Sequence, residues 1–190
     1  MIFSEKKKLR RKLLRQRQSL DKKIWQEKSN RLCTRIKSLS LFQEAKTILA
    51  YFTFRQEPIL NSLFTMEHCW GFPRCVDQSL IWHYWTPGDA LNVGTYGILE
   101  PDLNAPILDS FEVDLILVPA VACDNQGYRL GYGGGFYDRL LNSPQWQHIP
   151  TIGIVFDFAY VNRLSVESWD CKLKAICTET QYLNLLESDN

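Results

Sequence analysis

The segment Arg129-Leu130-Gly131-Tyr132-Gly133-Gly134-Gly135-Phe136-Tyr137-Asp138-Arg139 places four glycines within five positions. It follows the most hydrophobic run of the chain, Leu115 to Ala122, which predicts a buried strand. Glycine reaches positive φ without strain and has no side chain that would hold a ligand away. A buried strand, a glycine-rich turn and helix-forming residues in this order are typical of sites where backbone N–H groups bind a phosphate. The segment therefore predicts a strand, turn and helix with an anion site at the turn.

The end of this loop differs from two common phosphate-binding motifs. It lacks the Gly-Lys-Ser/Thr ending of a Walker motif, and it lacks the spacing and the downstream acid of a dinucleotide fingerprint. Asp138 could hold Mg²⁺, which takes one or two carboxylates together with phosphate oxygens and water. It could equally be a carboxylate at a helix start, where it interacts favourably with the helix dipole. The sequence leaves both roles of Asp138 open.

Segments of helical and strand character alternate on both sides of the loop. The expected helices are 3–18, 20–38 with Ser19 or Asp21 as its N-cap, one that opens at Pro58, and 136–141. The expected strands are 47–54, 71–76, 80–85, a central strand at 113–121, 151–156 and a last strand at 175–178, with a loop over 86–106. This alternation predicts an α/β three-layer sandwich, in which a mostly parallel central sheet has helices on both faces.

Length and composition limit the class of protein. The chain has 190 residues, 45% of them hydrophobic, so it can build one sizeable core and is short for two. We expect a single domain over residues 1–190. No stretch reaches the roughly 18 apolar residues of a membrane helix, and the basic start lacks the apolar block of a signal peptide. We therefore expect a cytoplasmic protein with no membrane partner.

Charge is distributed unevenly along the chain. Residues 1–37 carry 14 Lys and Arg against 3 Asp and Glu, a net charge of +11, and the other residues carry 8 against 18, a net charge of −10. Such asymmetry indicates an anionic partner for the basic end, which could be a nucleotide, a nucleic acid or a carboxylate-rich substrate. A solvated helix face is the alternative.

The first expected helix carries basic residues on its apolar side. At 100° per residue, Lys6, Arg10 and Arg17 project into the middle of the apolar arc. That arc consists of Ile2, Phe3, Leu9, Leu13, Leu14 and Leu20. Long basic side chains that face inward need a counter-ion or a ligand, because an unpaired buried charge is costly. The spacing would let Lys6 and Arg10 converge on one anion, and a structural salt bridge is the alternative.

Candidate catalytic groups are few elsewhere. Glu57 follows a hydrophobic strand and precedes Pro58, so it could face a substrate at the strand ends or cap a helix. No Ser or Cys shows the base and orienting group that an activated nucleophile needs, so the sequence does not support covalent catalysis.

Together these pieces resemble a known family. The resemblance rests on Lys6-x-x-Leu9-Arg10, Glu57, Gly97-Ile98-Leu99-Glu100-Pro101, Val118-Pro119 through Arg139, and Trp169-Asp170. These motifs are similar to those of the 5-formyltetrahydrofolate cyclo-ligases, also called methenyltetrahydrofolate synthetases. The most specific piece is the glycine segment with its Phe136-Tyr137-Asp138-Arg139 ending.

The resemblance implies an ATP-dependent and Mg²⁺-dependent ligase of one-carbon metabolism. Its reaction would close 5-formyltetrahydrofolate to 5,10-methenyltetrahydrofolate and release ADP and phosphate. ATP would phosphorylate the formyl oxygen, the neighbouring nitrogen would attack the activated carbon, and phosphate would leave. Phosphoryl transfer depends on positioning and charge neutralisation more than on a protein nucleophile, which suits a chain without an evident one.

The resemblance also implies roles for individual residues. The catalytic group would be Lys6, Arg10, Tyr132 and Gly134. The ATP site would be Lys6, Arg10, Arg129, Leu130, Gly131, Tyr132, Gly133, Gly134, Gly135, Phe136 and Tyr137. The folate site would be Arg10, Phe52, Glu57, Tyr132, Gly133, Gly134, Gly135 and Phe136. The Mg²⁺ ligands would be Asp138 and Asp170.

One position departs from the family pattern. Many members carry lysine where this chain has Gly134, so the phosphate site has one positive charge less. Arg129 or Arg139 could compensate. We expect a monomer that binds 5-formyltetrahydrofolate and ATP. A non-catalytic nucleic-acid-binding protein is the alternative, and the inward aim of Lys6 and Arg10 favours the enzyme, because a nucleic-acid arm would place its cations outward.

Overall fold

A computed structural model describes residues 2–185, with side chains described from residue 5 onward. The apolar residues Ile2 and Phe3 of the first helix therefore lie outside the described side chains. The helices are α1 (Ile2–Gln18), α2 (Lys22–Lys37), α3 (Ser40–Glu44) and α4 (Phe136–Asn142), with 3-10 turns η1 (Ser110–Glu112) and η2 (Asp157–Ala159). The strands are β1 (Thr47–Leu49), β2 (Cys69–Val76), β3 (Ser79–Tyr84), β4 (Leu91–Val93), β5 (Leu99–Pro101), β6 (Leu115–Pro119), β7 (Ala122–Asp124), β8 (Arg129–Leu130), β9 (Thr151–Ile154), β10 (Tyr160–Val161), β11 (Ala175–Cys177) and β12 (Tyr182–Asn184).

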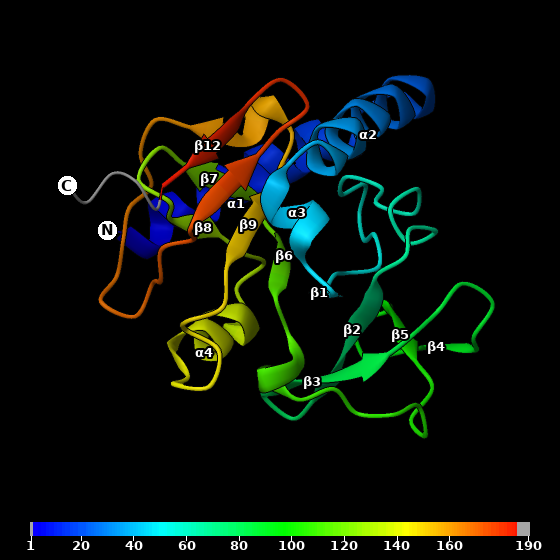
Figure 1. Ribbon diagram of the computed structural model, residues 1–190. Helices are drawn as coiled ribbons and strands as arrows, with labels where there is room; N and C mark the ends of the chain where they lie inside the picture. Colours follow the sequence, from blue (N-terminus) through cyan, green and yellow to red (C-terminus); the bar gives the residue numbers. More distant parts are fainter. Residues whose placement is uncertain (1, 186–190) are drawn as a thin grey trace.

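A seven-stranded sheet forms the centre of the fold, in the order β12-β11-β9-β6-β1-β2-β3 (Figure 1). The strands from β11 to β2 pair in parallel, and only the edge strands β12 and β3 run antiparallel to their neighbours. The predicted central strand is therefore central, and the expected mostly parallel sheet is confirmed. A three-stranded sheet β10-β7-β8 and the hairpin β4-β5 lie outside it.

Helices cover both faces of the central sheet, as predicted. Successive residues of a strand point to opposite faces, so β6 contributes to two hydrophobic clusters. Leu115 and Leu117 pack in the cluster that contains the buried residues of α2 and α3. Ile116 and Val118 pack in the cluster that contains the buried leucines of α4. Helix α1 packs elsewhere, against the three-stranded sheet.

The chain after β1 differs from the sequence prediction. The strand expected at 47–54 ends at Leu49, and the helix expected to open at Pro58 is replaced by turns. The Pro58 carbonyl, which an α-helix would use, instead accepts a hydrogen bond from the Tyr51 hydroxyl at 3.0 Å. The Ile59 carbonyl likewise accepts from Cys33 Sγ at 3.2 Å. Side chains therefore bind two of the carbonyls that lie in the first turn of the expected helix.

Three further expectations needed correction. The loop expected over 86–106 contains the β4-β5 hairpin, and β12 follows the strand expected to be last. The strand directly before the glycines is β8, the first two residues of the glycine segment, whose partner is β7, and not the central strand β6. The predicted helix after the glycine segment is confirmed as α4, and Asp21 is the N-cap of α2, because its carboxylate accepts from Lys23 N at 2.8 Å. Among the described residues, no helix is long and apolar enough to span a membrane.

Candidate active site

A cavity of about 920 Å³ lies where the chain leaves the carboxyl ends of β1 and β6. Its walls come from α1, the segment after β1, the β4-β5 hairpin, the glycine segment with α4, and the turn before Asp170. Every residue that the resemblance selects for a site lines this cavity. The fold thus brings together residues from Lys6 to Asp170, at the strand ends where α/β sheets bind ligands.

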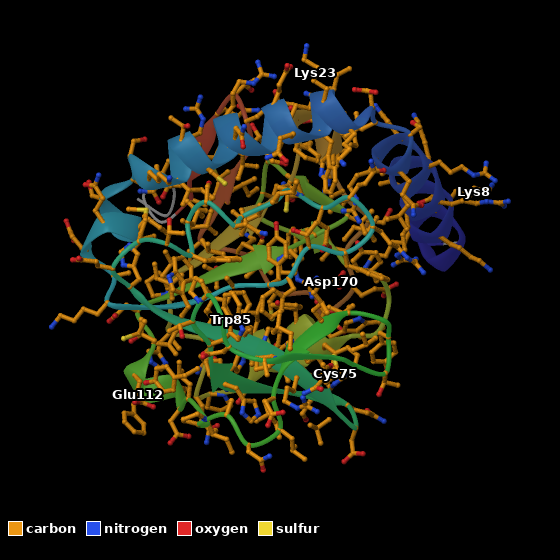
Figure 2. The ribbon with its side chains drawn as sticks, turned by 90° about the vertical axis from the view of Figure 1, so that its right-hand side faces the viewer. Lys8, Lys23, Cys75, Trp85, Glu112 and Asp170 are labelled. Carbon is orange, nitrogen blue, oxygen red and sulfur yellow. The ribbon has the colours of Figure 1, made fainter. Side chains whose placement is uncertain are left out.

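Helix α1 places its basic residues on two sides. Lys7 and Lys8 are exposed, and Figure 2 shows Lys8 extending away from the body of the protein. Lys6 and Arg10 are half-buried and line the cavity, and Arg17 is buried, so the predicted inward aim is confirmed. Burial lowers the pKa of Arg10.

The two cavity-lining cations of α1 have different partners. Lys6 Nζ lies 2.5 Å from Asp170 Oδ2, so the salt bridge that the sequence left open is formed. Arg10 Nε donates a hydrogen bond to the Gly131 carbonyl at 2.7 Å. Lys6 is therefore tied to the turn that carries Asp170, and Arg10 is tied to the glycine loop.

The glycine loop has a conformation that depends on glycine at two positions. Gly133 has φ 103° and Gly135 has φ 70°. The carbonyls of Gly131 and Gly134 accept hydrogen bonds from Arg10 and from Arg139 Nη2, the latter at 2.9 Å. By contrast, the backbone N–H groups of residues 132–135 have no hydrogen-bond partner among the described residues. The loop therefore has fixed carbonyls and free donors, which suits an anion.

Two arginines bring positive charge close to this loop. Arg129 is 8% exposed, and its Nη1 lies 2.6 Å from the place where a Cβ on Gly131 would be. Arg139 also donates to the Gln78 carbonyl at 2.7 Å, and it lies over the Phe136 ring. Both residues line the cavity, so their positions are compatible with the predicted compensation for Gly134.

The two candidate metal ligands each pair with a cation. Asp138 Oδ1 lies 2.6 Å from Arg129 Nη2, and Asp170 Oδ2 accepts from Lys6 and from Glu167 N. In each carboxylate the other oxygen has no hydrogen-bond partner among residues 5–185. The described part of the chain holds no cluster of three or more His, Cys, Asp or Glu that could bind a metal. This donor set fits Mg²⁺ that takes its remaining ligands from phosphate and water.

Glu57 is buried, with 3% exposure, and lines the cavity. It closes a turn in which Arg55 and Gln56 have φ 47° and 55°, and Glu57 N donates to the Phe54 carbonyl at 3.0 Å. Its Oε2 accepts from Phe54 N at 3.0 Å and its Oε1 from the Tyr132 hydroxyl at 2.9 Å. Burial raises the pKa of Glu57 to about 7, against the opposing effect of Arg17. No helix follows, so the helix-cap interpretation of Glu57 is wrong.

Aromatic rings line the cavity on two sides. Phe52 stacks on Phe72, with ring centroids 4.1 Å apart, and therefore has a fixed orientation. On the β4-β5 hairpin, the exposed Tyr96 contacts the Phe136 ring edge-on, with centroids 5.7 Å apart. No pattern in the sequence singles out Tyr96, because its partner Phe136 lies 40 positions away along the chain.

Arg17 is a second residue whose role the sequence did not reveal. Its guanidinium donates to the Tyr132 hydroxyl, so it contacts one of the residues that line the cavity. The inward projection of Arg17 was the signal, but its partners lie far away along the chain.

Comparison with known proteins agrees with the motifs. A model of the 5-formyltetrahydrofolate cyclo-ligase family matches residues 2–179. The 5-formyltetrahydrofolate cyclo-ligase of Escherichia coli K12 is 31% identical over 182 residues, which cover 89% of this chain and 98% of that protein. The protein of the same name from Haemophilus influenzae is 33% identical over 141 residues, which cover 69% and 74%.

A solved structure extends the agreement to the fold. The 5,10-methenyltetrahydrofolate synthetase of Aquifex aeolicus superposes with a TM-score of 0.86 at 30% identity, over 97% of this chain and 95% of that one. The resemblance recognised from the motifs and the α/β fold class are both confirmed. The chain belongs to the 5-formyltetrahydrofolate cyclo-ligase family and is an enzyme of that kind.

Proposed function

We propose that the protein uses ATP and Mg²⁺ to convert 5-formyltetrahydrofolate into 5,10-methenyltetrahydrofolate, with release of ADP and phosphate. Family membership indicates cyclo-ligase activity. The observation that supports the finer proposal is the composition of the cavity. One part has a glycine loop with free N–H groups and two basic side chains from α1, and another part has Phe52, which stacks on the buried Phe72, and the buried Glu57.

The phosphate part of the cavity suits activation of the formyl group. A formamide oxygen is a poor leaving group, so it must be phosphorylated before the neighbouring nitrogen can displace it. Lys6, Arg10 and the N–H groups of the glycine loop would hold the triphosphate in line with that oxygen and neutralise its charge. Asp138 and Asp170 would hold Mg²⁺, which would supply further charge neutralisation at the phosphate oxygens.

The other part of the cavity suits the folate. The 2-amino group and ring N–H of a pterin are hydrogen-bond donors that fit the carboxylate of Glu57. Phe52 offers an apolar surface to the ring, and Arg10, Tyr132, Gly133, Gly134, Gly135 and Phe136 would border the formyl group. Tyr132 and Gly134 would thus lie next to the reacting atoms, together with Lys6 and Arg10. We further propose a monomeric, cytoplasmic enzyme that binds no nucleic acid.

A direct assay tests the proposal. The purified protein is mixed with ATP, Mg²⁺ and 5-formyltetrahydrofolate, and the near-ultraviolet absorbance of the methenyl product is followed. We expect an absorbance rise that needs all three components and one ADP for each product formed. If folded protein shows no ATP-dependent rise, the proposed function is wrong.

Replacing Glu57 with glutamine is expected to raise KM for 5-formyltetrahydrofolate by about 10-fold to 100-fold, because a charge-assisted hydrogen bond is lost. The pKa of about 7 also predicts a pH effect. Below that pH the carboxylate becomes protonated, so the folate KM of the unmodified protein should rise as the pH falls. In Glu57→Gln this pH dependence should disappear.

Two comparisons sharpen this test. The exposed Glu44 provides the matched control Glu44→Gln, which should keep the folate KM and its pH dependence. The KM for ATP should change little in either variant. A rise in KM for ATP as large as that for folate would mean that Glu57 does not belong to the folate part of the cavity.

A further inference from the structure

Arg17 ties together three segments that form the cavity. It lies in the last turn of α1 and is 3% exposed. Its Nε donates to the Arg55 carbonyl at 3.0 Å, its Nη1 to the Ala120 carbonyl at 3.2 Å, and its Nη2 to the Tyr132 hydroxyl. These partners belong to the turn before Glu57, the chain just after β6, and the glycine loop. Tyr132 and Glu57 are among the described residues that line the cavity, and Arg17 is not. Arg17 therefore contacts a lining residue from outside the cavity wall.

The Tyr132 hydroxyl connects Arg17 to Glu57. It accepts a hydrogen bond from Arg17 and donates its own proton to Glu57 Oε1 at 2.9 Å. A hydroxyl that accepts from a cation becomes a stronger donor, because neighbouring hydrogen bonds polarise one another. With Oε2 held by Phe54 N, both oxygens of the carboxylate are fixed. Each oxygen retains the capacity to accept another hydrogen bond.

Arg17 is the buried cation next to this carboxylate. The titratable and charged groups around Glu57 are Arg17 of α1, Tyr51 and Arg55 of the segment after β1, Tyr132 of the loop and Tyr137 of α4. Burial raises the pKa of each of these three tyrosines, so they remain neutral near neutral pH. Arg55 is exposed, and its charge is therefore screened by solvent. Arg17 is thus the main charge that opposes protonation of Glu57.

We propose that Arg17 is a positioning residue for folate recognition, which acts through the Tyr132 hydroxyl to orient Glu57 and to keep its carboxylate ionised. The inference rests on the proposed function, because it takes a pterin ring as the group that Glu57 binds. An ionised carboxylate accepts hydrogen bonds at both oxygens, whereas a protonated one carries a donor that would oppose the N–H groups of the ring.

The first test measures the ionisation of Glu57 without any turnover. Carbon-13 shifts of labelled glutamate carboxyls are followed against pH, and the Glu57 signal is assigned by its absence in Glu57→Gln. The pKa is expected at about 7 in the unmodified protein. Arg17→Gln should raise it by at least about one unit, since an opposite charge is removed from a buried site. Tyr132→Phe should raise it less, and Arg15→Gln, an exposed change on the same helix, should leave it unchanged.

The second test separates the two substrates. In Arg17→Gln the folate KM should rise about fivefold or more near pH 7, because a pKa raised by one unit lowers the ionised fraction of Glu57 from about one half to about one tenth, and it should recover toward the unmodified value near pH 9. The KM for ATP should stay within about twofold. Substitution of a residue that only stabilises the fold would instead lower the melting temperature and kcat and leave the pH dependence of the folate KM as in the unmodified protein.

These tests separate the inference from the proposed function. If the Glu57 pKa is the same in Arg17→Gln, Tyr132→Phe and the unmodified protein, the inference is wrong whether or not turnover occurs. If the pKa shifts and turnover occurs but the folate KM does not follow the pKa, the inference alone fails. If the unmodified protein has no cyclo-ligase activity, the proposed function fails, and the folate role of Arg17 fails with it. Should Arg17→Gln not fold, Tyr132→Phe replaces it in the first test, which needs no turnover, because this variant keeps the guanidinium and removes only the connecting hydroxyl.

Discussion

Replacing Lys6 with alanine is expected to lower kcat/KM for ATP by about 100-fold or more, with little change in KM for 5-formyltetrahydrofolate. Lys6 and Asp170 face each other on the cavity wall at 2.5 Å, and their side chains are only 14% and 12% exposed. An ammonium in such a partly desolvated place interacts with phosphate charge more strongly than a cation in water does. Steady-state kinetics with each substrate varied at saturating concentration of the other would measure the effect.

Asp170 makes a second variant necessary. Removing the ammonium leaves the mostly buried carboxylate of Asp170 without its cation. Lys6→Ala should therefore lower the melting temperature as well as kcat/KM for ATP. The double variant Lys6→Ala/Asp170→Asn removes both charges, and its amide oxygen can still accept from Glu167 N. We expect the double variant to recover the melting temperature but not the ATP kinetics.

Lys8 provides the matched control on the same helix. It is exposed and extends away from the body of the protein (Figure 2). Lys8→Ala removes the same charge, but solvent screens that charge, so kcat/KM for ATP should change by less than about twofold. Equal losses in Lys6→Ala and Lys8→Ala would mean that the net charge of the helix matters and not a contact with phosphate. If Lys6→Ala changed only the KM for 5-formyltetrahydrofolate, Lys6 would belong to the folate site and not to the ATP site.

The sequence predicted the parts of this site that depend on local patterns. An amphipathic helix buries its apolar side, so the 3.6-residue period of α1 was enough to place Lys6, Arg10 and Arg17 inward. The hydrophobic run that became β6 has no polar residue that could face solvent on either side from Leu115 to Val118, and it lies in the middle of the sheet. The glycines at 133 and 135 were recognisable because positive φ suits glycine.

What the sequence could not predict depends on contacts between distant residues. The Lys6–Asp170 pair spans 164 positions, and the Arg17–Tyr132 hydrogen bond spans 115. Neither spacing leaves a periodic signal. In the segment after Pro58 the burial was predicted correctly and the secondary structure was not. Leu60, Leu63 and Phe64 are buried, as their spacing indicated. They are buried in turns, in which the Pro58 and Ile59 carbonyls accept hydrogen bonds from the side chains of Tyr51 and Cys33.

Replacing Gly133 with alanine is expected to lower kcat/KM for both substrates by about 100-fold, the loss that a misplacement of about 1 Å can cause. The φ of 103° at Gly133 lies outside the regions that L-residues with a side chain adopt without strain. Space is not the obstacle, because an added Cβ would meet its nearest neighbour, Arg10 Cζ, at 3.8 Å. Relief of the strain must rotate the backbone of the loop, which moves its free N–H groups and the Gly131 carbonyl that holds Arg10.

Gly88→Ala is the matched control, because it introduces similar backbone strain outside the cavity. Gly88 has φ 110°, an added Cβ would meet nothing within 4 Å, and it is not among the described residues that line the cavity. Gly88→Ala and Gly133→Ala should therefore lose similar stability, about 1–3 kcal/mol in urea unfolding. Only Gly133→Ala should lose activity. Equal activity losses would mean that strain anywhere in the fold impairs the enzyme, and full activity of Gly133→Ala would mean that the N–H groups of the loop do not hold the phosphates.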